Sequence, residues 1–184
     1  MAKNNGKRFE KNIKDSCEKQ GILWEKYLDN GKFGFNENTV TRFSSENPCD
    51  GHFFHKGVLI YAELKTATTG AISYNQPPDI QPKGKPKPSI KAHQVKNLMA
   101  RAQYPGVKAG LMVEFSDRET KTKVIKGGTF FIDIETFNLW TQYCGKKSMN
   151  VDDARYIGTE VESVKLKVNA RYDIRGMLER ICDG

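Results

Sequence analysis

Two acidic residues and a lysine near the middle of the chain have the types and the spacing to do chemistry together. They are Asp50, Glu63 and Lys65, all within residues 47–66. Two carboxylate oxygens can hold a hard cation such as Mg²⁺, while a nearby ammonium can orient or deprotonate a water or neutralise charge that develops on a phosphate. Hydrolysis of a phosphodiester needs these parts.

A β-hairpin is the element that would bring the three side chains together. Two β-rich runs flank the Lys56-Gly57 pair, which suits a tight turn because Gly tolerates positive φ. Side chains alternate along a strand, so Glu63 and Lys65 share one face. The aliphatic residues expected to face a core lie on the other side: Val58, Ile60, Ala62 and Leu64. Pairing through the turn places Asp50 beside the end of the strand that carries Glu63 and Lys65.

Composition limits the class of protein and the kind of partner. The 184 residues, 38% of them hydrophobic, are enough for one folded domain over residues 1–184. The net charge of +8 predicts an acidic partner, with nucleic acid as the first candidate. We find no apolar run that approaches the roughly 20 residues of a membrane span, no signal peptide and no CxxC pair among the four cysteines. We therefore expect a cytoplasmic protein with reduced thiols and no membrane partner.

A structural zinc site is the alternative use of this region. Cys49, His52 and His55 are spaced like half of such a site. Strand alternation would point His52 away from the other two, and the sequence has no second Cys/His cluster to complete four ligands. The sequence therefore disfavours zinc.

The rest of the chain alternates between helical and strand patterns, which indicates an α/β fold with a mixed central sheet flanked by helices. Helices are expected over residues 7–20, 89–103, 134–143 and 174–181. Further strands are expected over residues 22–28, 109–115 and 124–132. The candidate helix N-caps are Ser89, Asp133 and Ser148. The tail, residues 159–184, is expected to pack on the body or on a second subunit.

Two long excursions flank the hairpin. Residues 29–47 are polar and rich in Gly and Asn, with interleaved aromatic and basic residues that suit contacts with bases and phosphates. Residues 67–89 are rich in Pro and Lys and are placed to hold DNA near the hairpin. The candidate DNA-binding residues are Lys32, Arg42, Lys83, Lys85, Lys87 and Lys91. The alternatives are that the aromatics fold back on the core and that residues 67–89 are a solubilising linker.

Asp50 followed by Glu63-Leu64-Lys65 resembles the Asp…Glu-x-Lys signature of the PD-(D/E)xK nuclease superfamily, with a spacing similar to that of its Holliday junction resolvases. Cys49 stands between Pro48 and Asp50, so the literal Pro-Asp pair is interrupted by one residue. Three flanking segments are similar to the RecU resolvases: GKRFEKNIK at 6–14, His93-Gln94, and GKKSMNVDDARYIG at 145–158.

The resemblance implies a restriction-endonuclease-like fold in which residues 29–47 form a protruding stalk. It implies catalytic roles for Asp50, Glu63, Lys65 and Gln94. It implies metal binding by Glu10, Asp50 and Glu63. The cofactor would be Mg²⁺, with Mn²⁺ able to substitute, and the substrate a four-way DNA junction cut by a homodimer in a bacterial cell or a phage-infected host.

Two other functions are open to this sequence. Another PD-(D/E)xK nuclease, of restriction or repair type, would share the catalytic residues and differ in substrate. A non-catalytic basic DNA-binding protein would use the acidic residues only to stabilise its fold. Carboxylates that approach phosphate repel it unless a cation intervenes, so their placement favours a metal-dependent enzyme.

Overall fold

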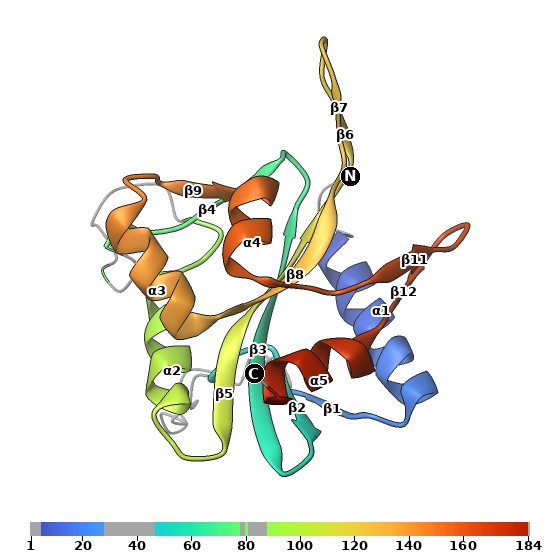
Figure 1. The fold of residues 1–184 in the computed structure, drawn as a ribbon, viewed down its shortest axis with the longest axis vertical. Coiled ribbons are helices and arrows are strands. Elements are labelled where there is room, and N and C mark those ends of the chain that lie inside the picture. Colours follow the sequence, from blue (N-terminus) through green and yellow to red (C-terminus); the bar gives the residue numbers. More distant parts are fainter. Residues whose placement is uncertain (1–4, 28–46, 78–79, 81–87, 184) are drawn as a thin grey trace, which may run out of the picture.

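The computed structural model describes residues 5–27, 47–77, 80 and 88–183. Its centre is a six-stranded mixed sheet in the order β1-β2-β3-β5-β8-β10 (Figure 1). The strands are β1 (Leu23–Lys26), β2 (Gly51–His55), β3 (Val58–Ala67), β5 (Val107–Phe115), β8 (Gly128–Asp133) and β10 (Thr159–Glu160). β3 and β5 run parallel, and the other neighbours are antiparallel. The predicted mixed sheet is confirmed.

Shorter strand pairs and five helices surround this sheet within the described residues. The pairs are β4 (Ala71–Ser73) with β9 (Ser148–Asn150), β6 (Arg118–Glu119) with β7 (Val124–Ile125), and β11 (Ser163–Lys165) with β12 (Ala170–Tyr172). The helices are α1 (Asn5–Gln20), α2 (Ala92–Ala102), α3 (Ile134–Tyr143), α4 (Val151–Ile157) and α5 (Ile174–Asp183). None of the described helices is both long and apolar enough to cross a membrane.

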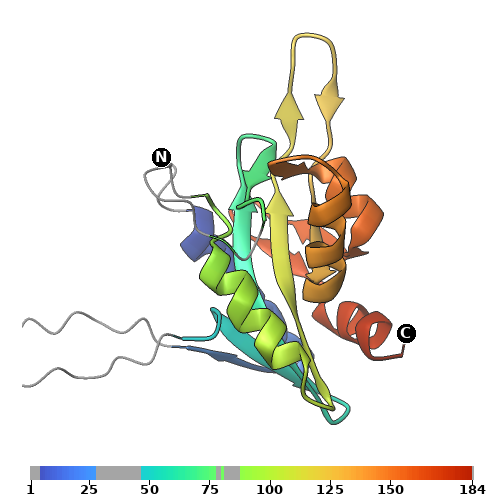
Figure 2. The same ribbon diagram turned by 90° about the vertical axis from the view of Figure 1, so that its left-hand side faces the viewer.

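The helices bury both faces of the sheet. α2, α3 and α4 cover one face, and α1 and α5 cover the other (Figures 1 and 2). The predicted stripe of α1, Phe9, Ile13 and Cys17, is buried, and the helix ends at Gly21 with φ of 63°. The tail helix α5 is confirmed and packs on the body of the same chain through Met177. Because both faces of the sheet are covered, both faces of a strand such as β3 are enclosed. One face of β3 packs in an apolar core, and the other is available for a site.

The hairpin of β2 and β3 has the predicted turn and register. Lys56 and Gly57 have φ of 48° and 80°, so both residues occupy the left-handed region that a two-residue hairpin requires. Gly51 pairs with Ala62 across the ladder, which brings Asp50, the residue before β2, level with Glu63. The aliphatic side of β3 enters the core with α1 and α5, as predicted from its alternation.

Two predicted helix caps are wrong. The helix expected from Ser89 begins at Ala92, because Ile90 bridges Tyr74 and Ser89 donates its N–H to Ser73 Oγ at 3.1 Å. Pairing with a neighbouring segment therefore keeps these residues extended, and Lys91 is the N-cap. Ser148 lies in β9, and Asn150 caps α4 instead by accepting a hydrogen bond from the N–H of Asp153. The predicted Asp133 cap of α3 is confirmed.

Two further segments differ from the prediction. The strand expected over residues 124–132 is divided into β7 and β8, and β7 pairs with β6 in a hairpin that projects from the end of the sheet (Figure 2). The excursion over residues 67–89 holds the short strand β4, which pairs with β9. The stretch 28–46 and residues 78–79 and 81–87 lie outside the described residues.

The turn between β2 and β3 gives a matched test of the hairpin. Gly57→Ala should lower the free energy of unfolding by about 1 to 2 kcal/mol, because a side chain in the left-handed region is strained. Lys56→Asn should leave stability unchanged or raise it slightly, since Asn tolerates this conformation. Urea denaturation of both variants beside the wild type measures the difference. Equal stabilities for Gly57→Ala and the wild type would contradict the turn geometry.

Candidate active site

Asp50 directly precedes β2 and is hydrogen-bonded to β3 on one side and to the residue after β1 on the other. Its Oδ2 atom accepts a hydrogen bond from the N–H of Leu64 at 2.7 Å. Its main-chain carbonyl accepts the N–H of Tyr27, at the end of β1, at 2.9 Å. The hairpin therefore delivers this carboxylate to the end of β3 where Glu63 and Lys65 lie, as predicted.

Glu63 lies on β3 and is only 3% exposed. Its Oε1 atom accepts a hydrogen bond from Lys65 Nζ at 2.7 Å and another from the side-chain amide of Gln94. The Lys65 side chain is 18% exposed, so its ammonium lies at the boundary between the interior and solvent. The predicted shared face of Glu63 and Lys65 is present as a direct ion pair.

Gln94 is held by the first turn of α2. Its Oε1 atom accepts the N–H of Lys91 at 2.9 Å, which forms one half of a capping box. Its Nε2 atom donates to Glu63 Oε1, so the helix start fixes the orientation of the acidic side chain. The adjacent His93 points to solvent and is exposed. Gln94, rather than His93, therefore belongs to the site.

The electrostatics of the cluster disfavour two charged carboxylates without a cation. Burial, and then the charge of Glu63, raise the pKa of Asp50 to about 7. The N–H of Leu64 and the ammonium of Lys65 act in the opposite direction, and Glu10 adds a small upward contribution to the pKa. The site is thus a place where an added positive charge is stabilised.

Two carboxylates and solvent suit Mg²⁺, which keeps several waters and usually takes one or two protein carboxylates. Asp50 and Glu63 are the two carboxylates of the cluster that could hold such an ion, and each also accepts a hydrogen bond from this chain. Across the described ranges, no three His, Cys, Asp or Glu side chains are grouped closely enough to hold one ion. Glu10 instead pairs with Lys26 at 2.5 Å, and its role as a ligand stays a prediction.

The zinc alternative finds no support in the contacts of its residues. The Cys49 thiol donates to the carbonyl of Gly51 at 3.0 Å, and burial raises its pKa to about 12, so it stays protonated. His52 lies beside the rings of Tyr27 and Tyr61. A thiolate ligand is therefore disfavoured here.

The candidate DNA-binding residues are mostly beyond what the structure describes. Lys32, Arg42, Lys83, Lys85 and Lys87 lie outside the described residues. Lys91 is partly buried at the start of α2, next to Gln94 and the site. Lys26 was not predicted from the sequence. It pairs with Glu10 on another element, and such a contact leaves no local pattern in the sequence.

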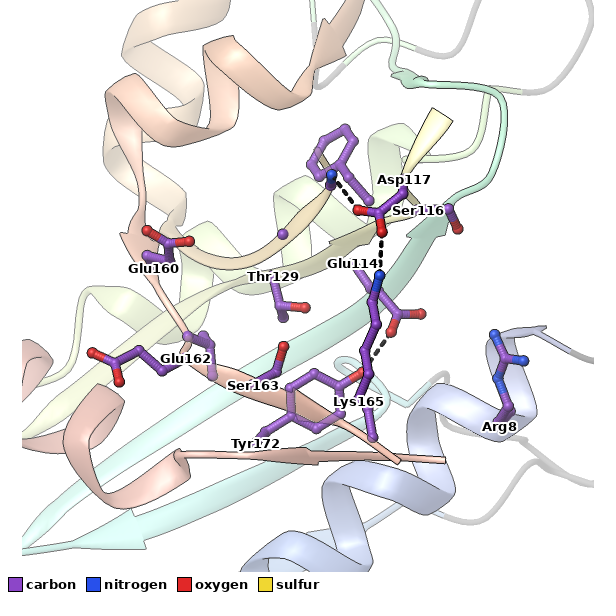
Figure 3. A pocket seen from close by; sticks show the side chains of 15 residues that line it. Arg8, Glu114, Ser116, Asp117, Thr129, Glu160, Glu162, Ser163, Lys165 and Tyr172 are labelled. Carbon is purple, nitrogen blue, oxygen red and sulfur yellow. Dashed lines mark hydrogen bonds and ion pairs between the residues drawn. The ribbon is translucent and has the colours of Figure 1, made fainter. Parts of the chain in front are cut away.

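A cleft elsewhere in the described structure is a different feature. It has a volume of about 620 Å³ and lies between the ends of β5 and β8 and the β11–β12 pair (Figure 3). Its charged lining residues are Arg8, Glu114, Asp117, Glu160, Glu162 and Lys165. Four carboxylates against two cations would repel a phosphate backbone, and none of the predicted catalytic residues lines it. The candidate active site is therefore the small polar cluster around Glu63.

Comparison with solved structures shows the class of fold. The chain is similar to Hjc, a Holliday junction resolvase from the archaeal hyperthermophile Archaeoglobus fulgidus, with a TM-score of 0.51 and 15% sequence identity. The match covers 84% of this chain and 95% of that one. The protein therefore has a resolvase-like fold.

Comparison of sequences gives one curated relative. The chain is 27% identical over 186 residues to the SPbeta prophage-derived uncharacterized protein YotM of Bacillus subtilis (strain 168), covering 98% of this chain and 86% of that protein. No family model matches the chain. The match extends over nearly the whole chain.

The pKa of Asp50 predicts a pH-dependent stability difference. The group has a raised pKa in the folded state, about 7 against an ordinary 3.8, so stability is lost progressively as pH rises from about 4 to 7, and the full penalty applies above pH 7. Asp50→Asn should therefore unfold with a free energy roughly 1 to 4 kcal/mol higher at pH 8 in EDTA, since one pKa unit is about 1.4 kcal/mol. The advantage should shrink as pH falls from 7 and vanish below about pH 4, where both states are protonated.

Urea denaturation across this pH range checks the expectation, with exposed Glu119→Gln as the control. The control should follow the wild type at every pH. A less stable Asp50→Asn protein at pH 8 would show that the carboxylate is not under the electrostatic stress inferred from its surroundings.

Proposed function

We propose that the protein is a metal-dependent endonuclease that resolves four-way DNA junctions by paired phosphodiester incisions. The observation that carries the proposal is the gathering of Asp50, Glu63 and Lys65 at one end of β3. The resolvase-like fold supports it, because Hjc, which shares that fold, is a Holliday junction resolvase. The basic balance of the chain, with a net charge of +8, suits a DNA substrate.

Asp50 and Glu63 are the residues that would hold the cation. Mg²⁺, or Mn²⁺ in its place, would neutralise charge on the phosphate and help to form the attacking water. The raised pKa of Asp50 supports this assignment, since a cation removes the repulsion between the two carboxylates. Gln94 is a positioning residue that holds Glu63 from the start of α2.

Lys65 is the basic group of this cluster that can act on the reacting atoms. Its ammonium lies 2.7 Å from Glu63 Oε1 and remains partly accessible to solvent. From there it can donate to a water, orient it, or stabilise negative charge on a phosphate oxygen. The ion pair with Glu63 keeps the ammonium in place.

Junction selectivity and dimer formation belong to the same proposal. The resemblance of the flanking segments to RecU suggests that residues 29–47 act as a stalk within a homodimer. A four-way junction has a central opening that linear duplex lacks, and two symmetric copies would match paired incisions. A restriction- or repair-type nuclease would share the catalytic residues, so the substrate preference separates the two functions.

The first test is cleavage of a synthetic four-way junction beside linear duplex. Asp50→Asn and Glu63→Gln should abolish Mg²⁺-dependent cleavage, and Lys65→Ala should lower its rate by about 10²-fold or more, because each removes a group from the cluster. Ca²⁺ should support binding with little turnover. Glu135→Gln, which changes an exposed carboxylate on α3, is the control and should cut like the wild type.

Cleavage at the wild-type rate by Asp50→Asn or Glu63→Gln would remove the site from the mechanism. Binding of junctions without any cleavage by the wild type would instead favour a non-catalytic DNA-binding protein. Equal cleavage of duplex and junction would favour the restriction or repair type.

The second test concerns substrate choice. Replacement of residues 31–45 by a short Gly/Ser linker should leave the protein folded and able to bind a divalent cation, while erasing its preference for junctions over duplex. Competition between labelled junction and duplex measures the preference, and circular dichroism monitors the fold. If the shortened protein still prefers junctions as strongly as the intact one, the stalk has no role in selection.

A further inference from the structure

The β6–β7 hairpin projects from the body of the protein at the end of the sheet (Figures 1 and 2). Each of its strands has two residues, and the residues from Ser116 to Glu119 and from Lys121 to Val124 are exposed. Val124 is 66% exposed, so even this apolar side chain contributes little to the core. An isolated two-stranded hairpin is at best marginally stable in water, so this one depends on its attachment to the body.

Hydrogen bonds hold the base of the hairpin. Asp117 accepts the N–H of Gly127 at 2.8 Å and also pairs with Lys165 on β11 (Figure 3). Arg118 donates to the carbonyl of Thr69, in the turn between β3 and β4, at 3.0 Å. These contacts join the hairpin to two neighbouring segments. The base of the projection is therefore held by hydrogen bonds to the body of the protein.

The tip of the hairpin is closed by its own turn. Thr120 donates its N–H to the carbonyl of Lys123 at 2.9 Å, and its hydroxyl donates to the same carbonyl at 2.7 Å. The N–H of Lys123 donates back to the hydroxyl of Thr120 at 3.1 Å. Lys121 and Thr122 form the end of the loop. A closed turn presents its side chains outward in a defined arrangement.

The hairpin carries an excess of positive charge. Residues 118–126 carry four cations against one carboxylate, Glu119. Arg118 is engaged at the base, which leaves Lys121, Lys123 and Lys126 as exposed ammonium groups. Among the described residues, none of these three lysines forms an ion pair. Cations on a projecting ribbon that adds little to the core suit a polyanionic ligand.

The position of the hairpin relates it to the candidate active site. Lys65 pairs with Val113 across the parallel β3–β5 ladder, and the chain continues from Val113 toward the hairpin tip. At about 3.3 Å per residue, the eight steps from Val113 to Lys121 span roughly 26 Å. One turn of B-DNA is about 34 Å long. The lysines thus lie within one helical turn of a phosphate bound at Lys65.

We propose that the β6–β7 hairpin is a DNA-binding element that contacts the phosphate backbone of a duplex arm of the substrate, through Lys121, Lys123 and Lys126. A two-stranded ribbon of this kind also fits the width of a major groove. The inference rests on the proposed function for its choice of ligand. It adds a contact site that lies outside the catalytic cluster and both excursions that the sequence singled out.

The experiment compares two triple variants that change the net charge equally. The test variant is Lys121→Gln, Lys123→Gln and Lys126→Gln. The control carries Lys14→Gln, Lys19→Gln and Lys56→Gln, three exposed lysines on α1 and the β2–β3 turn. Affinity for a four-way junction is measured in Ca²⁺ across a series of salt concentrations, and thermal unfolding checks that both variants fold.

The test variant should bind about 10-fold or more weakly, and the slope of log affinity against log salt should fall by about 2 to 3, since each phosphate contact contributes about 0.9. The control should keep the wild-type slope. An unchanged affinity and slope for the test variant would overturn the proposal and leave the hairpin to a protein partner. An equal loss in the control would also overturn it, because overall charge would then explain the effect.

The two proposals can fail separately. Junction cleavage by the wild type bears on the proposed function, whereas the difference between the two triple variants bears only on the hairpin. A wild type that cuts junctions while both triple variants bind like it would overturn the hairpin alone. A wild type that binds no DNA at any salt concentration would overturn both.

Discussion

The carboxylate of Glu63 is buried between the central sheet and α2, where an ionised group costs several kcal/mol unless partners replace its hydration. Lys65 supplies the opposite charge, and Gln94 supplies a second hydrogen-bond donor. Asp50 adds a further carboxylate to the same small volume. Burial of this cluster works against stability, so the surrounding apolar packing on both faces of the sheet has to support it. A cost of this kind is typical of a site retained for function.

The start of α2 shows how local structure serves this cluster. Because Ser89 and Ile90 pair with the segment around β4, the helix begins two residues later than a cap at Ser89 would place it. That shift makes Gln94 the third residue of the helix, where a side chain can reach back to the cap. One amide group then satisfies the helix start with its oxygen and Glu63 with its nitrogen. A helix that began at Ser89 would place Gln94 beyond the reach of its own cap.

The features predictable from the sequence were those with local causes. The β2–β3 hairpin follows from alternation and the Lys56-Gly57 turn, and its register alone places Asp50 beside Glu63. Asp133 caps α3 through a local contact, because its side chain accepts the N–H groups of Glu135 and Thr136. The sequence therefore sufficed for the central cluster and most of the sheet.

The features that sequence reasoning missed depend on contacts between distant segments. Ser148 has the type of a cap, but its pairing with Ser73 keeps it in a strand. The strands β6 and β7 are short and polar, so no hydrophobic period marks them. The Glu10 and Lys26 pair joins two elements whose proximity only the packed fold defines. Periodicity reports which face a residue occupies, and it does not report which other element lies opposite.

The pairing of β1 with β2 has a consequence for how such a protein can diversify. Lys26 and Gly51 are register partners, and Tyr27 bonds to the carbonyl of Asp50, so the chain leaves and re-enters the sheet at adjacent points. Closing a connection costs free energy that grows only with the logarithm of its length, about 0.6 kcal/mol for each doubling. Residues 28–46 can therefore change in length and sequence over evolutionary time while Asp50 keeps its place. The position of Asp50 in the sheet therefore does not depend on the length of that connection.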